Sequence, residues 1–457
     1  MPLLKRSLLA IVPILLSTQF SIAQKYSPQQ LKEDLDFIQH QLFAVQANPF
    51  TELNRQQYTD VFNQIRLLLK DSMTTRDFYR LVKPTISFIS DEHAAISLPE
   101  EMKPFGDSTL LLPVTLKKQG YNYVVDLVLG TETGVSPGSV VHKIDHNDID
   151  GIVRVCTGYT TGFPSQREAK CDKYFGYLYG LAFPTAPTYT LTLADGKEVV
   201  VRGATFGTWM TYINNNNGSG NSCPQMVTYR RSGNAGYINA CSFATHNDKE
   251  YNAVSHAIDS IYSLVQKDGI KELIIDVSRN TGGNSAVGNL LIAGFCNQPY
   301  RTYQCNWRRS DEYLKTIHGW GVQNPQYEQL KPGEVLHYDS DTVFPQENAA
   351  RFKGKVYVLI GEGTFSSAIM FATMIKDNHL APLVGVTPPD GHPTHFGEMY
   401  SATAPHTRLG IRFGVKEWIR PAGKTTANIL LPDISTPIKE PVDIGRLLEV
   451  IHEKSLP

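Results

Sequence analysis

The sequence predicts a mixed α/β (α+β) chain of several domains: a helical segment, a small β-rich module and a C-terminal α/β core. Three observations lead to this prediction. Apolar residues first recur at helical spacing, then alternate as in strands, and finally fall into strands that alternate with helices. The 457 residues agree with about three units of roughly 150 residues each.

The composition is that of a folded chain without a basic surface. Lys and Arg number 43 against 44 Asp and Glu, a formal net charge of −1. This balance disfavours bulk binding of nucleic acid, which needs a positive field. With 41% hydrophobic and 19% charged residues, the chain can bury a core and is unlike a disordered tail.

The first residues predict an export signal. Lys5 and Arg6 precede an apolar stretch over residues 7–20, and Ser21-Ile22-Ala23 is typical of a cleavage site. A membrane span is the alternative, but it needs about 20 apolar residues and Pro13 interrupts this stretch. We therefore expect an exported protein, periplasmic or extracellular, without a transmembrane span after signal cleavage.

The next part, to about residue 90, is expected to be helical. Ser27, Pro28 and Gln30 form a capping box with Pro at the first helical position. Three apolar stripes at helical spacing then follow: Leu31, Leu35, Ile38 and Leu42; Tyr58, Phe62, Ile65 and Leu69; and Phe78, Leu81 and Val82, after a cap at Thr74 or Thr75.

From residue 110 the pattern becomes that of strands. Strands are expected over residues 111–116, 121–129, 139–144, 188–193 and 198–202, the last two joined by an Asp-Gly hairpin turn. The stretch that follows, NNNNGSGNS at residues 214–222, is of low complexity and predicts a linker.

Beyond this linker, strands alternate with helices, which predicts crossover units and a sheet covered by helices. Strands are expected at residues 235–239, 272–277, 355–361 and 382–386, and helices at 249–266, 285–295 and from residue 366. The predicted units are a signal peptide, a helical segment, a β-rich module, a linker and a core: 1–23, 24–105, 106–213, 214–223 and 224–457.

Six cysteines remain after the signal, an even number that allows disulfides in an exported chain. Nearest-neighbour pairing is the expectation: Cys156–Cys171, Cys223–Cys241 and Cys296–Cys305. A structural zinc is a weak alternative because no C-x-x-C spacing occurs. Buried free thiols are the other alternative.

Two strand-to-helix turns could carry chemistry. In the first, Gly282 and Gly283 follow a buried strand, and paired glycines let backbone approach a ligand. The structural alternative is a tight turn. In the second, Ser366 opens an apolar helix, where unpaired N–H groups can stabilise an oxyanion. The structural alternative is that Ser366 only caps the helix.

A third piece, Asp91-Glu92-His93, lies far upstream, and alone it would be an ordinary polar loop. Together the pieces resemble the serine peptidases that include the tail-specific (C-terminal processing) proteases and the tricorn protease. The motifs occur in the order of that family: Asp91-Glu92-His93, residues 276–283, Thr364-Phe365-Ser366-Ser367-Ala368, Lys376-Asp377-Asn378, Val384-Gly385 and Pro432-Asp433.

This resemblance implies a crotonase-like or ClpP-like α/β core with Ser366 as the nucleophile. It also implies an oxyanion hole made by the N–H of Ser367 and a glycine N–H at Gly282 or Gly283. No metal or organic cofactor is needed for such chemistry, and the partner is a peptide or protein substrate. The oligomeric state is left open.

The sequence departs from the tail-specific branch because the lysine expected about 25 residues after the nucleophile is missing. Lys376 cannot replace it, since ten helical residues at 1.5 Å put it about 15 Å away. The tricorn-like branch uses an upstream histidine, which His93 matches, so His93 is the expected general base. His392 and His395 are its rivals. Ile369, at a position often acidic in tail-specific proteases, also favours this branch.

A carboxylate should orient the base, and three residues are candidates: Asp91, Glu417 and Asp433. Of these, Glu417 is the possible orienting group. The middle module loosely resembles a degenerate PDZ domain, through residues 137–145, and a plain β-rich spacer is the alternative.

The expected function is that of an exported serine endopeptidase that cleaves peptides or unfolded and C-terminal protein segments through an acyl-enzyme. The runner-up is a non-catalytic peptide- or lipid-binding protein, since retinoid-binding relatives share the fold. A regulatory or chaperone role in the envelope is a third hypothesis.

Overall fold

The computed structural model describes residues 24–130, 134–216, 223–347, 350–424 and 428–454. The expected signal peptide, residues 1–23, and residues 217–222 of the expected linker lie outside this part of the chain. Within the described residues, no helix combines the length and the apolar character that a membrane crossing requires.

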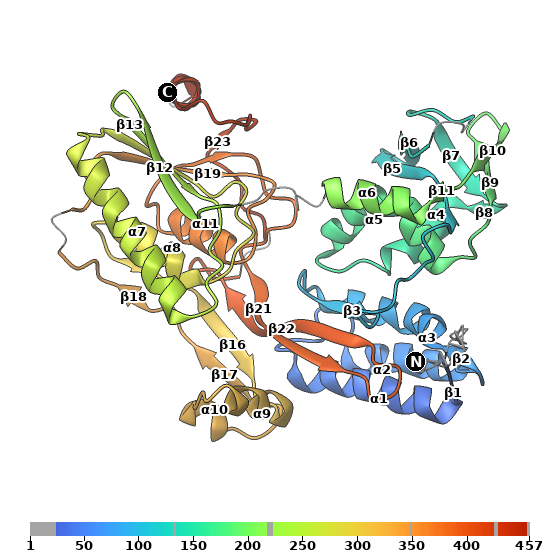
Figure 1. The fold of residues 1–457 in the computed structure, drawn as a ribbon. Helices are drawn as coiled ribbons and strands as arrows, with labels where there is room; N and C mark the ends of the chain where they lie inside the picture. Colours follow the sequence, from blue (N-terminus) through green and yellow to red (C-terminus); the bar gives the residue numbers. More distant parts are fainter. Residues whose placement is uncertain (1–23, 131–133, 217–222, 348–349, 425–427, 455–457) are drawn as a thin grey trace, which may run out of the picture.

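The C-terminal core is a six-stranded sheet between two layers of helix (Figure 1). Its strand order is β12-β13-β14-β19-β20-β23, parallel except for the edge strand β12. The strands are β12 (Val227–Ser232), β13 (Ala235–Ala240), β14 (Glu272–Asp276), β19 (Lys355–Ile360), β20 (Leu383–Gly385) and β23 (Ile434–Ser435). The helices are α7 (Asp248–Lys267), α8 (Ser285–Ala293) and α11 (Ser367–Asp377) on one face and α12 (Ile444–Lys454) on the other.

The central strands are apolar throughout because both faces of the sheet are covered. Leu273 and Ile275 of β14 join the core under α7, α8 and α11, while Ile274 joins the core under α12. The expected apolar face of α7 is buried at Val254 and Ile258. The alternating pattern of the sequence therefore predicted this layer correctly, to within one or two residues at most element ends.

A second sheet reaches from this core to the N-terminal helices. Its strands run β17-β16-β22-β21, and β3 pairs with the part of β22 that β16 leaves unpaired. The elements here are β3 (Ala95–Ser97), β15 (Tyr300–Arg301), β16 (Gln304–Arg308), α9 (Asp311–Gly319), α10 (Pro325–Glu328), β17 (Val335–Tyr338), β18 (Thr342–Val343), β21 (His395–Thr403) and β22 (Gly410–Ile419). The hairpin β21–β22 lies along the N-terminal helices (Figure 1), where the buried Asp34 accepts a hydrogen bond from the N–H of Thr407 at 2.7 Å.

The N-terminal segment is helical, as expected. The capping box at Ser27 is present, and Thr74 caps the third helix. The elements are β1 (Lys25–Tyr26), α1 (Pro28–Val45), α2 (Arg55–Leu68), β2 (Met73–Thr74), α3 (Thr75–Val82) and the 3₁₀ helix η1 (Lys83–Ile89).

The middle module combines a five-strand meander with three helices, none of which the β-type sequence pattern predicted. The sheet order is β10-β9-β7-β6-β5, with β8 on β7. The elements are β4 (Leu110–Leu111), β5 (Val114–Gln119), β6 (Asn122–Val128), β7 (Val140–Ile144), β8 (Asn147–Asp148), α4 (Ile149–Thr157), α5 (Pro164–Ala182), β9 (Thr188–Leu193), β10 (Glu198–Arg202), β11 (Ala204–Thr205) and α6 (Phe206–Asn216). This arrangement is compatible with the expected PDZ-like module.

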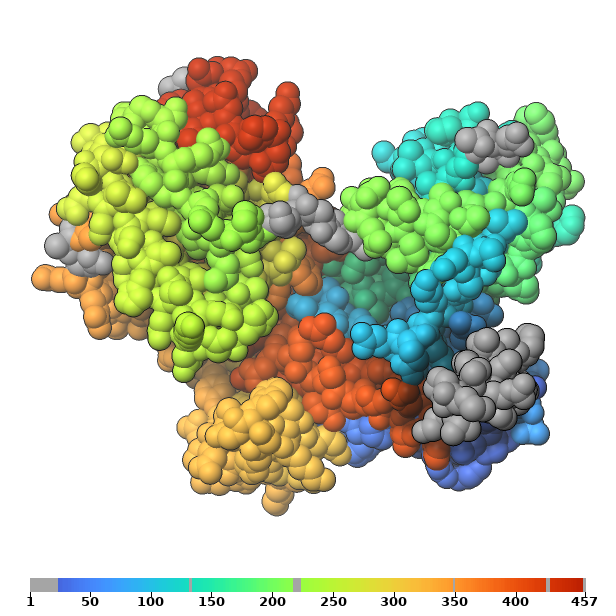
Figure 2. Space-filling view, in the orientation of Figure 1, coloured from blue at the N-terminus to red at the C-terminus, as the bar shows by residue number. Residues whose placement is uncertain are grey.

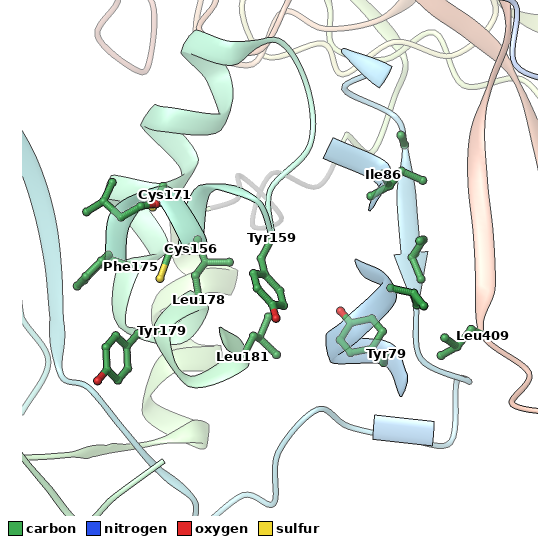
Figure 3. Close-up of a cluster of buried hydrophobic side chains, with 14 of the residues drawn as sticks. Tyr79, Ile86, Cys156, Tyr159, Cys171, Phe175, Leu178, Tyr179, Leu181 and Leu409 are labelled. Atoms are coloured by element: carbon green, nitrogen blue, oxygen red, sulfur yellow. The ribbon is translucent and has the colours of Figure 1, made fainter. Parts of the chain in front are cut away.

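The module shares a hydrophobic core with the N-terminal segment. Tyr159 and Leu181 on its side approach Tyr79 and Ile86 on the other (Figure 3). The space-filling view shows the molecule hollowed between the α/β core and the module (Figure 2).

Two expectations are corrected. The expected linker begins inside α6, which continues to Asn216, so residues 214–216 are helical. Of the three expected disulfides only Cys223–Cys241 is formed, and the other four cysteines are buried thiols. The Cys171 thiol instead donates to the Val153 carbonyl at 3.7 Å.

Candidate active site

The two predicted strand-to-helix turns lie side by side. They follow β14 and β19, which are parallel neighbours paired from Glu272↔Lys355 to Asp276↔Leu359. Hydrogen bonds fasten the turns together: the N–H of Phe365 donates to the carbonyl of Asn280 at 3.0 Å, and the hydroxyl of Thr364 donates to that of Val277 at 2.8 Å. The carboxyl ends of parallel strands therefore bring Ser366 and the glycine pair into one place.

Ser366 has a strained backbone at the start of α11. Its φ is 53° and its ψ is −123°, a conformation that a residue with a Cβ rarely adopts. Within the described part of the chain its hydroxyl makes no helix-capping hydrogen bond. The capping alternative therefore lacks its hydrogen bond, and the strain instead marks a residue held in place by its surroundings.

Both glycines are required by close packing. A Cβ on Gly282 would lie 2.7 Å from the Cβ of Ser366 and 2.9 Å from the N of Ser367. A Cβ on Gly283 would lie 2.3 Å from the carbonyl carbon of Phe243. Their φ angles, +99° and +133°, are also ones that favour glycine.

The two glycine N–H groups differ in what they bind. The Gly282 N–H donates to Oδ1 of Asn280 at 2.8 Å and is therefore already occupied. For the N–H groups of Gly283 and Ser367, the described residues provide no acceptor. The hydroxyl of Ser367 donates to the Gly283 carbonyl at 2.6 Å, which ties these two residues together. Two donors thus remain free beside Ser366.

Asn280 is a site residue to which the sequence reasoning gave no role. It is fully buried and, besides holding the Gly282 N–H, donates from Nδ2 to the carbonyl of Ala240 on β13 at 2.8 Å. A buried amide whose donor and acceptor are both used fixes the conformation of the turn. The signal that the sequence offered was its place in the motif at residues 276–283, which resembles that of the family.

His93 lies against the turn that carries Ser366. Its ring is 4.8 Å from the ring of Phe365, measured between centroids, and its side chain is 12% exposed. Its Nδ1 is buried without a hydrogen-bond partner and lies 3.6 Å from Oδ1 of Asp91. The sequence motif around His93 and the turn around Ser366 are therefore neighbours in space, although 273 positions separate the two residues.

Asp91 holds this histidine loop onto the second sheet. Its carboxylate is fully buried and accepts the His93 N–H at 2.8 Å and the Gly414 N–H of β22 at 2.7 Å. Gly414 lies between the part of β22 that pairs with β3 and the part that pairs with β16. Asp91 thus satisfies a β22 N–H at a position where neither β3 nor β16 pairs with the strand.

The other two candidate carboxylates bind elsewhere. Glu417 accepts hydrogen bonds from Asn306 at 2.8 Å and from Lys424 at 2.6 Å. Asp433 pairs with Lys376 and accepts the Leu383 N–H at 2.8 Å. Among the three, Asp91 is the one beside His93.

His392 and His395, the alternative candidates for the general base, are both buried. Nδ1 of His395 faces the carbonyls of His392 and Pro393 at 3.0 and 3.3 Å, so it carries the proton and Nε2 is the free nitrogen. Burial, with a contribution from the charge of His93, lowers the pKa of His395 to about 4. The His392 ring packs on Phe163, 4.2 Å away, and burial lowers its pKa to about 4.

Glu92, between Asp91 and His93 in the sequence, also has an unusual pKa. Burial, reinforced by the neighbouring charge of Asp91, raises the pKa of Glu92 well above its ordinary value. One of its carboxylate oxygens is buried without a hydrogen-bond partner.

A cavity of about 810 Å³ lies between α4, α5 and η1, and none of the predicted site residues lines it.

Comparisons with known proteins give a family match for part of the chain and a similar overall fold. Residues 234–436 match the model of Peptidase family S41. No curated protein sequence matches the chain.

Solved structures are similar in fold. The crystal structure of mature CPAF aligns with a TM-score of 0.57 at 14% identity, covering 93% of this chain and 95% of that chain. Mature CPAF complexed with lactacystin aligns with a TM-score of 0.55 at 14% identity, covering 93% of this chain and 96% of that chain. The photosystem II D1 C-terminal processing protease aligns with a TM-score of 0.42 at 13% identity, covering 93% and 97%.

Proposed function

We propose that the chain is a serine peptidase whose nucleophile is Ser366, which lies within residues 234–436, the part that matches the model of Peptidase family S41. The observation that carries this proposal is the strained conformation of Ser366 beside two N–H groups that lack acceptors. A serine at the start of a helix can attack a carbonyl carbon when free N–H donors lie next to its hydroxyl. These donors stabilise the negative charge that develops on the carbonyl oxygen.

The proposed oxyanion hole consists of the N–H groups of Ser367 and Gly283. The Gly282 N–H, the other candidate from the sequence, is taken by Asn280, so Gly282 supports the site through its lack of a side chain. Removing one donor of such a pair typically costs about 10²–10³ in rate.

His93 is the proposed general base. It would accept the hydroxyl proton of Ser366 during attack and return it to the leaving amine, after which water would hydrolyse the acyl-enzyme by the same route. Its support is the contact with Phe365 and the carboxylate of Asp91 at 3.6 Å. Asp91 is the proposed orienting carboxylate, in preference to Glu417, whose oxygens are bound by Asn306 and Lys424.

We further propose that the enzyme acts on unfolded or C-terminal segments of exported proteins. The support is the sequence of residues 1–23, which is that of an export signal, and the Cys223–Cys241 disulfide, which persists in oxidising compartments.

Labelling with a fluorophosphonate tests the nucleophile. Wild-type protein should be labelled at Ser366, as located by mass spectrometry, and Ser366→Ala should not be labelled. Labelling should be absent after denaturation, because an unaided hydroxyl is not reactive. If Ser366 resists the reagent and casein is not cleaved, the alternative of a non-catalytic peptide- or lipid-binding protein replaces the proposal.

A further inference from the structure

The first two turns of α5, in the middle module, touch both halves of the proposed active site. This helix begins at Pro164, after the N-cap residue Phe163. One group of contacts goes to the loop before β21, which carries His392 and leads into His395 at the start of that strand. A second group goes to the segment that leads into His93.

The first contact group centres on Gln166. Its side chain is buried, and Nε2 donates to the carbonyl and to Oδ1 of Asp390 at 2.9 and 3.0 Å. Lys170, one turn later, places Nζ 3.7 Å from the same carboxylate. Phe163 stacks on His392 with 4.2 Å between ring centroids. Three side chains of one helix end therefore hold two residues of one loop.

That loop rests directly on the nucleophile turn. A Cβ on Gly391 would lie 2.3 Å from Cδ1 of Ile369 and 2.6 Å from the carbonyl oxygen of Thr364. Thr364 and Ile369 flank Ser366 in sequence, two positions before it and three after. A shift of the loop would therefore press on the residues that define the Ser366 conformation.

The second contact group centres on Arg167. Its guanidinium donates to the Ser87 carbonyl of η1 and to the carboxylate of Glu52, the latter at 2.6 Å. The other oxygen of Glu52 accepts the Ser90 hydroxyl at 2.6 Å. Ser90 precedes Asp91, so these bonds fix the stretch from which His93 projects.

We propose that the N-terminal end of α5 is a clamp that positions the proposed base and nucleophile relative to each other. Gln166 and Arg167 are its two positioning residues, one for each half of the site. The inference rests on the proposed function, because it assigns a role in that site to a module outside the family-matched residues 234–436. A displacement of about 1 Å between reacting groups can cost about 10²-fold in rate, so a clamp of this kind matters for turnover.

The sharpest variant is Gln166→Glu. The glutamate keeps the acceptor that caps α5, since Oε1 of Gln166 receives the Phe163 N–H at 3.0 Å. It replaces the donor to Asp390 by a negative oxygen and so sets two carboxylates against each other. The matched control is Glu168→Gln, two positions further on the exposed side of the same helix.

Two readouts are measured for each variant: casein hydrolysis, and hydrogen–deuterium exchange of residues 87–93 and 387–395. Gln166→Glu should exchange faster at 387–395 and should lower kcat by roughly 10- to 100-fold, with a smaller change in KM. Gln166→Glu/Asp390→Asn should recover part of both losses, because the new amide can donate to the new carboxylate. Arg167→Lys should instead raise exchange at 87–93.

The control decides what the changes mean. Glu168→Gln should match wild type in exchange and in kcat. Wild-type exchange and kcat in Gln166→Glu, or the same loss in Glu168→Gln, would overturn the clamp. If wild-type protein cleaves nothing, the proposed function fails, whereas the exchange data still confirm or reject the clamp. Should Gln166→Glu unfold, Asp390→Asn alone removes the charge that Lys170 contacts and should raise exchange at 387–395.

Discussion

Gly282 and Ser366 are so close that a Cβ atom on the glycine would lie 2.7 Å from the Cβ of the serine. This proximity is a property of two turns on neighbouring strands, and it fixes how near the glycine pair comes to Ser366, the proposed nucleophile. The free N–H of Gly283 is placed beside Ser366 only because the preceding residue lacks a side chain.

Gly282→Ala should therefore inactivate the enzyme without unfolding it. The added methyl must displace Ser366 or Ser367, since each has an atom within 3 Å of it. We expect kcat/KM on casein to fall at least about 10²-fold, as when an oxyanion donor is lost. Gly269→Ala is the matched control: its φ is +64° but a Cβ there meets nothing within 4 Å, so activity should be retained.

Ser366→Ala and His93→Ala should each lower kcat by several decades, on the order of 10⁴-fold. The double variant should fall little further, because residues of one catalytic unit are strongly non-additive. His392→Ala should cost tenfold or less, since its ring packs on Phe163 instead of on the nucleophile turn. Steady-state kinetics of the four variants check this. Normal turnover by His93→Ala would move the base to another residue.

Acid should destabilise the folded chain through His395. Its folded pKa, about 4, lies below the ordinary value of 6.5. Between these two values the unfolded chain binds a proton that the folded chain does not, so stability is lost as the pH falls from about 6.5 to about 4. The loss from this residue is on the order of 3 kcal/mol.

Urea unfolding between pH 4 and pH 7.5 measures this loss. The free energy of unfolding of His395→Gln should fall less steeply towards acid than that of wild type, whatever the variant costs at neutral pH. His142→Gln, at an exposed histidine of the module, should follow the wild-type slope. Equal slopes for wild type and His395→Gln would show that the buried imidazole contributes nothing.

Glu92→Gln should stabilise the protein at neutral pH. Burial raises the pKa of this carboxyl, so the folded state prefers the protonated form, and that preference costs stability as the pH rises above the ordinary value. A glutamine removes the cost. Thermal unfolding should show a higher Tm than wild type at pH 7.5, and the difference should disappear near pH 4. The exposed Glu100→Gln should show neither effect.

The cysteines should divide into two bonded and four free. Alkylation in denaturant without reductant should modify four thiols, and reduction beforehand should raise the number to six, because only Cys223–Cys241 is bonded. Without denaturant the modification should be slow, since all four thiols are buried. Intact mass spectrometry gives the numbers, and two modified thiols in the unreduced sample would point to a second disulfide.

The strands and helices of the core could be predicted because buried positions recur regularly along each of them. The helix of the module that contains Gln166 could not. Its Gly176 and Gly180 argue against a helix by intrinsic preference. The structure explains both: a Cβ on Gly176 would lie 2.0 Å from the Leu112 carbonyl oxygen, and one on Gly180 would lie 2.6 Å from Leu111. Close crossing of a strand by a helix is a tertiary requirement, and a single sequence does not reveal it.

The site shows the same division. The strained serine turn and the glycine pair belong to local patterns, so their place at one sheet edge was expected. That Asn280 occupies the Gly282 N–H depends on a side-chain rotamer, and that His93 meets Phe365 depends on contacts across most of the chain. The first was not expected from the sequence, whereas the resemblance had already led to the expectation that His93 lies near Ser366.

The hydrogen bond from Gly414 to Asp91 joins residues 323 positions apart. A ribosome makes the histidine loop early and the strand that anchors it almost last. While the chain is being synthesised, Asp91 has no strand N–H to bind and the loop lacks its anchor on β22. The anchor of the histidine loop can therefore form only after Gly414 has been made, when nearly the whole chain has been synthesised.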